Sequence, residues 1–230
     1  MNDFIKILEL TYIFKNANID LTQNFESIYS NIEDGALRKS LESTINKYFT
    51  NLSLPDAATD YDRLLLSLRE KDAVFTFNWD PFLFDAWDRN HHVVKLPEIF
   101  FLHGNVRIGS CIKHQQWGRK GESCPTCNKR FADVPLLYPV EKKNYSENEY
   151  IKASWDNAKI WFSSAFTITM FGYGAPSSDV DAVELLRTAW FEGSERVMEH
   201  IEIIDIANSN ILTGRWGSLY YSFIQKGYLF

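Results

Sequence analysis

The sequence predicts an α/β protein in which a parallel sheet carries helices on both faces, with one small inserted module. From residue 71 on, short β-rich runs alternate with helical patterns, as in parallel sheets. Each of these runs ends in glycine or polar residues. All three cysteines lie between Cys111 and Cys127, which marks the inserted module, with bounds at residues 108–131.

Composition limits the class of protein. The chain has 230 residues, 45% of them hydrophobic and 15% aromatic, enough for one packed domain with an insertion. A net charge of −6 and a pI near 5.4 argue against a nucleic acid or an anionic membrane as the main partner. We expect no secretory signal and no membrane span. The clustered, odd number of cysteines favours a reducing, cytoplasmic location. The sequence is compatible with a homo-oligomer or with a partner chain.

The elements follow in order along the chain. Residues 1–70 read as a helical segment, in which Leu37, Leu41 and Ile45 repeat at four-residue spacing. The α/β domain then spans residues 71–230, with strands predicted over residues 73–77, 99–102, 166–171 and 200–206. Helices are predicted over 81–90, around Trp155, Ala158 and Phe162, and after Ser178.

The inserted module has the spacing of a zinc knuckle. Two hooks, each with two residues between its ligands, supply Cys111, His114, Cys124 and Cys127. Four protein ligands leave no open position, so the predicted Zn²⁺ is structural. The alternative is a loop with free thiols and an exposed histidine. The adjacent His91 and His92 are expected to point apart into solvent.

Polar residues or glycines follow each predicted strand, where ligands bind in parallel α/β sheets. They are Asn78 and Asp80, His103, Gly172 to Gly174, and Asp205 to Asn208. Each has a simpler explanation as well. Asn78 and Asp80 are favoured helix caps, His103 can be a buried structural histidine, and Gly172 to Pro176 can be an ordinary strand-to-helix turn.

These residues together resemble the sirtuin-like (SIR2-like) family. The run Phe75-Thr76-Phe77-Asn78-Trp79-Asp80 is similar to the strand-end motif of sirtuins, and Leu102-His103-Gly104 resembles their Leu-His-Gly. The knuckle begins just after that histidine, where sirtuins carry a zinc ribbon. The segment FGYGAPSSD at residues 171–179 resembles one common in bacterial SIR2-like proteins. The resemblance implies a Rossmann-like domain that handles NAD.

The resemblance also implies roles for individual residues. His103 would be the general base, Asn78 would hold the nicotinamide ribose or the attacking water, and Asp80 would orient that region. The remaining residues implied to contact the cofactor are Thr76, Gly172, Tyr173, Ser177, and either Asp205 or Asn208. The favoured reaction is hydrolysis of NAD, as in bacterial anti-phage proteins. The alternatives are protein deacylation and a zinc-stabilised binding or assembly module without catalysis.

One motif of the family is missing from the sequence. Sirtuin-like domains open with a strand and a Gly-Ala-Gly-x-Ser loop around the cofactor's pyrophosphate, and residues 1–230 contain no such loop. The chain is then a fragment, a protein with a misassigned start, or a decayed homologue. Because backbone N–H groups of that loop bind phosphate, we expect these 230 residues to bind NAD weakly or not at all.

Overall fold

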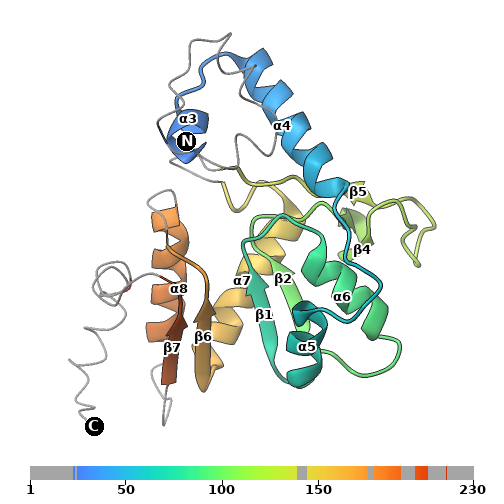
Figure 1. Cartoon of the computed structure of the whole chain (residues 1–230), viewed down its shortest axis with the longest axis vertical. Helices are drawn as coiled ribbons and strands as arrows, with labels where there is room; N and C mark the ends of the chain where they lie inside the picture. The colour runs from blue at the N-terminus through green and yellow to red at the C-terminus, as the bar shows by residue number, and fades with distance from the viewer. Residues whose placement is uncertain are drawn as a thin grey trace. The chain divides into compact units, whose positions relative to one another are not determined.

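The computed structural model describes residues 23, 25–138, 144–175, 179–192, 200–206 and 216. The chain forms two compact units, Met1–Trp155 and Asp156–Phe230 (Figure 1). In the described residues the helices are α3 (Phe25–Ser30), α4 (Gly35–Thr50), α5 (Asp60–Ser67), α6 (Phe82–Asn90), the 3-10 turn η1 (Ile112–His114), α7 (Glu149–Ser164) and α8 (Val180–Glu192). The strands are β1 (Ala73–Thr76), β2 (Glu98–Phe101), β3 (Ile108–Cys111), β4 (Gln116–Arg119), β5 (Ala132–Asp133), β6 (Thr167–Phe171) and β7 (His200–Ile204).

The four predicted strands of the α/β domain form two parallel pairs. β1 pairs with β2 in the first unit, and β6 pairs with β7 in the second. The parallel pairing and the mixture of helices and strands confirm the predicted fold class. The observed strand ends differ by one or two residues from the predicted ones, since the pattern of side chains fixes a strand better than its last residue.

Helices α5 and α6 pack beside the first parallel pair. Leu65 of α5 and Leu83 and Ala86 of α6 form a buried cluster, against which Val74 of β1 and Ile99 of β2 pack. Burying a leucine side chain contributes about 1.5–3 kcal/mol, so this small cluster holds both helices to the strands. Helix α6 begins at Phe82 with Pro81 at the N-cap position, one residue later than predicted, and the carboxylate of Asp80 accepts a hydrogen bond from the backbone N–H of Phe82 at 3.1 Å.

The N-terminal part of the described chain is helical, as the spacing predicts. The carboxylate of Asp34 caps α4 by accepting from the N–H groups of Ala36 and Leu37 at 2.8 and 3.2 Å. Leu41 and Ile45, one turn apart, are fully buried in a cluster with α3. The division of the chain at residue 70 remains a prediction.

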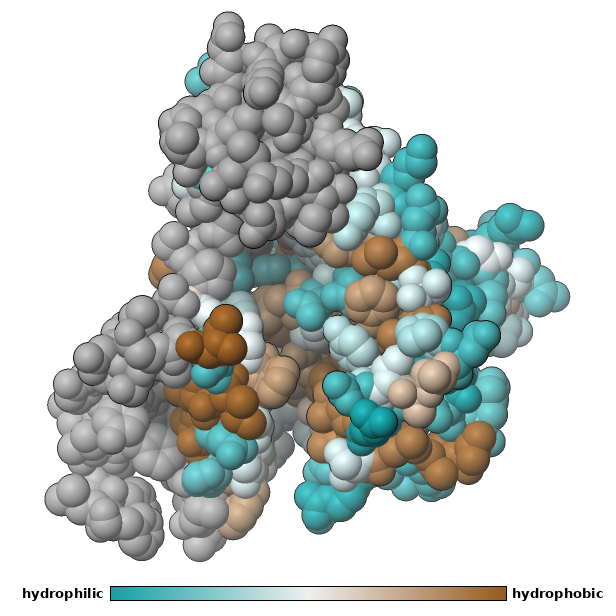
Figure 2. All heavy atoms as spheres, in the orientation of Figure 1, coloured by the Kyte–Doolittle hydropathy of each residue, from teal (hydrophilic) through white to brown (hydrophobic). Residues whose placement is uncertain are grey.

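Strands β3, β4 and β5 form a separate antiparallel sheet in the order β4-β3-β5. This sheet, which we call the knuckle sheet, lies within the first unit and contains the predicted hooks. Figure 2 shows mainly hydrophilic side chains over the outer loops beside β4. Among the described residues, no helix combines the length and the apolar character needed to cross a bilayer.

Candidate metal centre and strand-edge site

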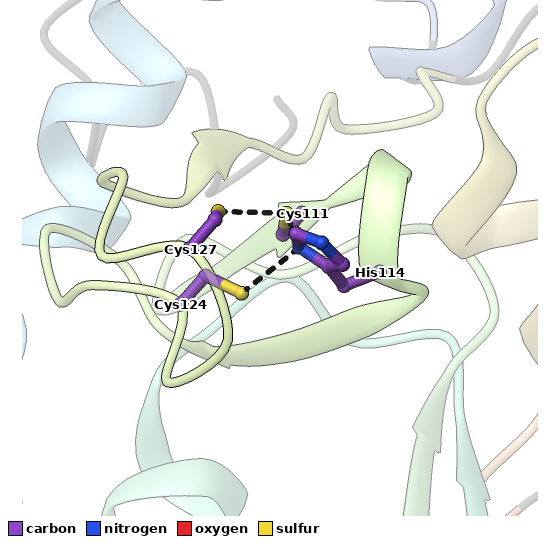
Figure 3. Close-up of side chains that lie close together, drawn as sticks. All are labelled: Cys111, His114, Cys124 and Cys127. Atoms are coloured by element: carbon purple, nitrogen blue, oxygen red, sulfur yellow. Dashed lines mark hydrogen bonds between the residues drawn. The ribbon is translucent and has the colours of Figure 1, made fainter.

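The four predicted zinc ligands converge on one point (Figure 3). Cys111 ends β3, His114 lies in η1, and Cys124 and Cys127 lie on the turn after β4. Their ligand atoms all lie within 4.8 Å of one another, although nine residues of chain separate His114 from Cys124. The knuckle sheet therefore brings both hooks together.

The distances fit a tetrahedral zinc ion. Zn–S bonds of about 2.3 Å and a Zn–N bond of about 2.0–2.1 Å place two sulfurs about 3.8 Å apart and a sulfur and a nitrogen about 3.6 Å apart. The Sγ atoms of Cys111 and Cys127 are 3.8 Å apart. Nδ1 of His114 lies 3.4 Å from Sγ of Cys111 and 3.6 Å from Sγ of Cys124. The chemistry of this donor set and its spacing both fit Zn²⁺.

Both hooks end in a residue with left-handed backbone, which the sequence pattern alone does not reveal. Gln115 follows the second ligand of the first hook with φ 49°, and Asn128 follows the second ligand of the other with φ 56°. The backbone N–H of Gln115 donates to the carbonyl of Ile112 at 3.3 Å, and that of Asn128 donates to Cys124 at 2.8 Å. A left-handed residue closes each hook, and asparagine is among the few side chains that tolerate this region well.

The environment of Cys124 favours its ionised form. Burial alone raises the pKa of this thiol, but hydrogen bonds from the backbone N–H groups of Cys127 and Thr126 outweigh burial. Together with the neighbouring Cys111 and His114 they lower the pKa of Cys124 to about 6. A thiolate is the form of cysteine that binds a metal, so the turn prepares this sulfur for the ion.

Gln116 is a further residue at the metal centre that the sequence analysis missed. Its Oε1 accepts from Sγ of Cys124 and from the hydroxyl of Thr126, both at 3.2 Å. With Cys124 as a metal-bound thiolate, the amide of Gln116 can turn and donate its N–H to the sulfur instead. The residue thus supports a ligand in either state.

Two arginines hold the knuckle sheet against α6. Arg107 donates from Nε to Asp85 at 3.2 Å and from Nη2 to the carbonyl of Leu52 at 2.8 Å. Arg119 of β4 pairs with Asp88. Arg107 and Asp85 are largely shielded from water, so each of their hydrogen bonds contributes about 1.5–3 kcal/mol, whereas the more exposed Arg119–Asp88 pair contributes less. The module is therefore fixed to the helix that follows β1.

The carboxyl ends of β1 and β2 lie side by side, as the parallel pairing requires. Thr76 is the register partner of Phe101, and the N–H of Leu102 donates to the carbonyl of Thr76 at 2.9 Å. His103 follows directly and is buried. The histidine and the polar residues that the sequence analysis singled out therefore follow the adjacent carboxyl ends of two paired strands.

The backbone around His103 is tightly fixed. Its carbonyl accepts from the N–H of Leu137 at 2.9 Å, and the carbonyl of Leu102 accepts from the indole of Trp155 at 3.0 Å. Gly104 has φ +77°, and a Cβ there would lie 2.2 Å from the carbonyl oxygen of Pro135. Only glycine fits this position, so the glycine of the Leu-His-Gly run has a structural reason.

The polar residues after β1 have local partners. The hydroxyl of Thr76 accepts from the N–H of Asn78 at 3.1 Å, while the Asn78 side chain is exposed. Burial raises the pKa of the Asp80 carboxyl. The bond from Phe82 gives Asp80 a local partner at the start of α6, and the roles of these residues toward NAD stay predictions.

Asn105 links the loops that follow β1 and β2, and no motif pointed to it. Its buried side chain donates from Nδ2 to the carbonyl of Asp80 at 2.6 Å and accepts the N–H of Arg107 at 2.9 Å. The N–H of Val106 also donates to the carbonyl of Trp79 at 3.2 Å.

In the second unit, the ends of β6 and β7 also adjoin. The N–H of Gly172, which has φ +62°, donates to the carbonyl of Ile204 at 2.8 Å, so Gly172 lies next to the turn that holds Asp205. The hydroxyl of Tyr173 donates to the buried Asp179 at 2.9 Å. Ser177 and Asn208 lie outside the described residues. The contacts of this group with NAD stay predictions.

No family model and no curated protein matches the chain. Among solved structures, a Sir2–p53 peptide–NAD⁺ complex is 17% identical with a TM-score of 0.40, over 97% of this chain and 99% of that chain. A Sir2 homologue–NAD complex is 12% identical with a TM-score of 0.39, over 90% and 86%. An ADP-ribose complex of a mutant Sir2 homologue is 11% identical with a TM-score of 0.39, over 96% and 80%. These matches name the family that the sequence motifs resemble, and similarity at this level carries no information about the chemistry of the site.

Proposed function

We propose that this chain is an NAD-handling domain that cleaves the bond between nicotinamide and ribose, with His103 as the general base. The observation that carries the proposal is the arrangement of residues at the adjacent carboxyl ends of β1 and β2. There, a buried histidine adjoins a turn with an exposed asparagine, Asn78. Ligands of parallel α/β sheets bind at the carboxyl ends of the strands, and histidine is the most frequent acid–base residue in catalysis.

The proposed reaction is hydrolysis. Water attacks the ribose carbon that carries nicotinamide, the carbon–nitrogen bond breaks, and nicotinamide and ADP-ribose leave with one released proton. His103 takes that proton from the attacking water, directly or through a ribose hydroxyl. Asn78 holds the water or the ribose through its exposed amide. The hydrogen bonds of Asn105 keep the two loops at a fixed separation.

We also infer that Cys111, His114, Cys124 and Cys127 bind one structural Zn²⁺. The convergence of the four ligand atoms within 4.8 Å supports this, as does the closure of each hook by a left-handed residue. Four protein ligands leave no coordination position for substrate, so the ion would stabilise the knuckle sheet without taking part in the reaction.

The test is turnover of NAD by the full chain and by a His103→Ala variant. Millimolar NAD is needed, because we expect weak binding. Chromatography of nicotinamide and ADP-ribose measures the rate, and His103→Ala should lower kcat by roughly two to four orders of magnitude. His92→Ala is the matched control, because His92 is exposed and lies after the C-terminal end of α6. A folded His103→Ala variant with unchanged turnover would refute the role of this histidine.

The same assay separates the alternatives. Deacylation predicts that nicotinamide release depends on an added acylated peptide and yields acylated ADP-ribose instead of free ADP-ribose. A binding or assembly module predicts no nicotinamide release under any condition, together with an intact, metal-loaded fold. Either result would replace hydrolysis as the function.

A further inference from the structure

An aromatic side chain that belongs to no strand-end motif lies beside the imidazole of His103. Tyr145 lies in the segment before α7, and its ring centroid is 6.1 Å from that of His103 with an angle of 16° between the ring planes. The two rings are therefore nearly parallel and offset, which is a favourable arrangement of aromatic groups. Tyr145 is 42 positions away in sequence, so only the fold brings it there.

Two further rings complete this arrangement. Phe77 stands edge-on to His103, with centroids 4.8 Å apart and an angle of 78°. Trp155 contacts both Tyr145, at 4.7 Å, and Phe77, at 6.1 Å. Because the indole N–H of Trp155 also bonds to the carbonyl of Leu102, the ring that supports Tyr145 is tied to the backbone next to His103.

We propose that Tyr145 is a positioning residue that holds the His103 imidazole in a fixed orientation through its ring face. Phe77 lies nearly perpendicular to the imidazole, and without Tyr145 the imidazole would lose its nearly parallel neighbour. A histidine that acts as a general base must present one nitrogen to the proton that it accepts. Misplacing a catalytic group by about 1 Å costs roughly 100-fold in rate, so a side chain that fixes the imidazole would preserve the rate. This inference rests on the proposed function of His103.

The experiment compares Tyr145→Leu and Tyr145→Phe in the full chain. Tyr145→Leu removes the stacked ring and should lower kcat for NAD cleavage roughly 10- to 100-fold with little change in KM, because orientation and not binding is lost. Tyr145→Phe keeps the ring and should restore kcat to within about threefold of wild type. Phe75→Leu is the matched control, because it removes a stacked pair, Phe75–Phe100, from the same two strands without touching His103.

A second readout does not depend on NAD. The imidazole resonances of His103, identified by their loss in His103→Ala, should move in Tyr145→Leu, return in Tyr145→Phe, and stay in place in Phe75→Leu. Thermal unfolding establishes that each variant is folded.

A Tyr145→Phe variant as impaired as Tyr145→Leu would overturn the inference, since the phenol and not the ring would then matter. Unchanged resonances in Tyr145→Leu would also overturn it. If the wild-type chain leaves NAD intact, the proposed function fails, and the resonances alone then decide whether Tyr145 orients His103.

Discussion

Replacing one ligand of the metal centre gives a sharp test of the zinc proposal. Cys124→Ser removes the sulfur whose pKa the turn lowers to about 6, in a fully buried position. Structural zinc sites contribute about 10–16 kcal/mol of apparent binding free energy, so one of four ligands contributes about 2.5–4 kcal/mol. Loss of that ligand should weaken zinc binding by roughly two to three orders of magnitude.

The weaker zinc binding also lowers the free energy of unfolding, because zinc binds the folded chain. At a fixed free zinc concentration, a weaker affinity lowers the free energy of unfolding by the same 2.5–4 kcal/mol. For a chain of this size, each kcal/mol shifts the Tm by about 2–4 °C, so Cys124→Ser should lower the Tm by about 5–16 °C. Treatment of the wild-type chain with a strong chelator should also lower the Tm.

Two measurements decide the outcome. Elemental analysis of purified wild-type chain should find close to one zinc per chain, and circular dichroism gives the Tm. Thr126→Ala is the matched control, because Thr126 lies on the same turn and contributes a hydroxyl contact with Gln116 but no metal ligand. A wild-type chain without zinc, or a Cys124→Ser variant with unchanged zinc content and Tm, would refute the reasoning.

Two further predictions concern stability. Gly104→Ala should cost about 2–5 kcal/mol, because a Cβ would meet a backbone carbonyl at 2.2 Å and φ is +77°, whereas Gly121→Ala, with φ +89° and open space, should cost only about 1–2 kcal/mol in denaturant titrations. Asp62→Ala should cost about 3–5 kcal/mol because it removes a buried carboxylate that accepts from Arg89, Asn90 and Thr59, whereas Asp60→Ala at an exposed ion pair should cost under about 1 kcal/mol. The hydrogen bond from the guanidinium of Arg89 is the main reason why the pKa of Asp62 lies below its ordinary value of 3.8. The ionised Asp62 therefore stabilises the fold above that pH, and this stabilisation is lost as acid protonates the folded carboxyl. Acid titrations should therefore find a smaller loss of stability below about pH 4 in Asp62→Asn than in wild type, and equal losses would contradict this assignment.

The sequence predicted the parts of this fold that depend on local patterns. Strands β1 and β6 and helix α6 were found within one or two residues, since side-chain periodicity and the Asp80-Pro81 helix start are local signals. The hooks were found because their spacing is itself the signal. The left-handed residues Gln115 and Asn128 were missed, because neither is a glycine that would have marked the turn.

Contacts between individual side chains were out of reach of such patterns. The expectation that His91 and His92 point apart is wrong: their ring centroids are 3.6 Å apart, and His91 stacks on Trp87 at 4.4 Å. The stacking of Tyr145 on His103 had no sequence signal either, since it depends on the path of the chain between β5 and α7. Periodicity identifies which side chains are buried, and it does not identify which ones meet.

The position of the metal centre explains why a structural ion would matter to His103. Only seven residues separate His103 from Cys111, and three of them make the contacts that fix this stretch. Asn105 bonds to the carbonyl of Asp80, Arg107 bonds to Asp85 of α6, and Ile108 begins β3. A zinc ion at Cys111 would anchor one end of this stretch, and the β1–β2 pairing anchors the other. The loop after His103 would then be held at both ends. Loss of the metal should therefore loosen the loop at the carboxyl ends of β1 and β2, although the ion makes no contact with the substrate.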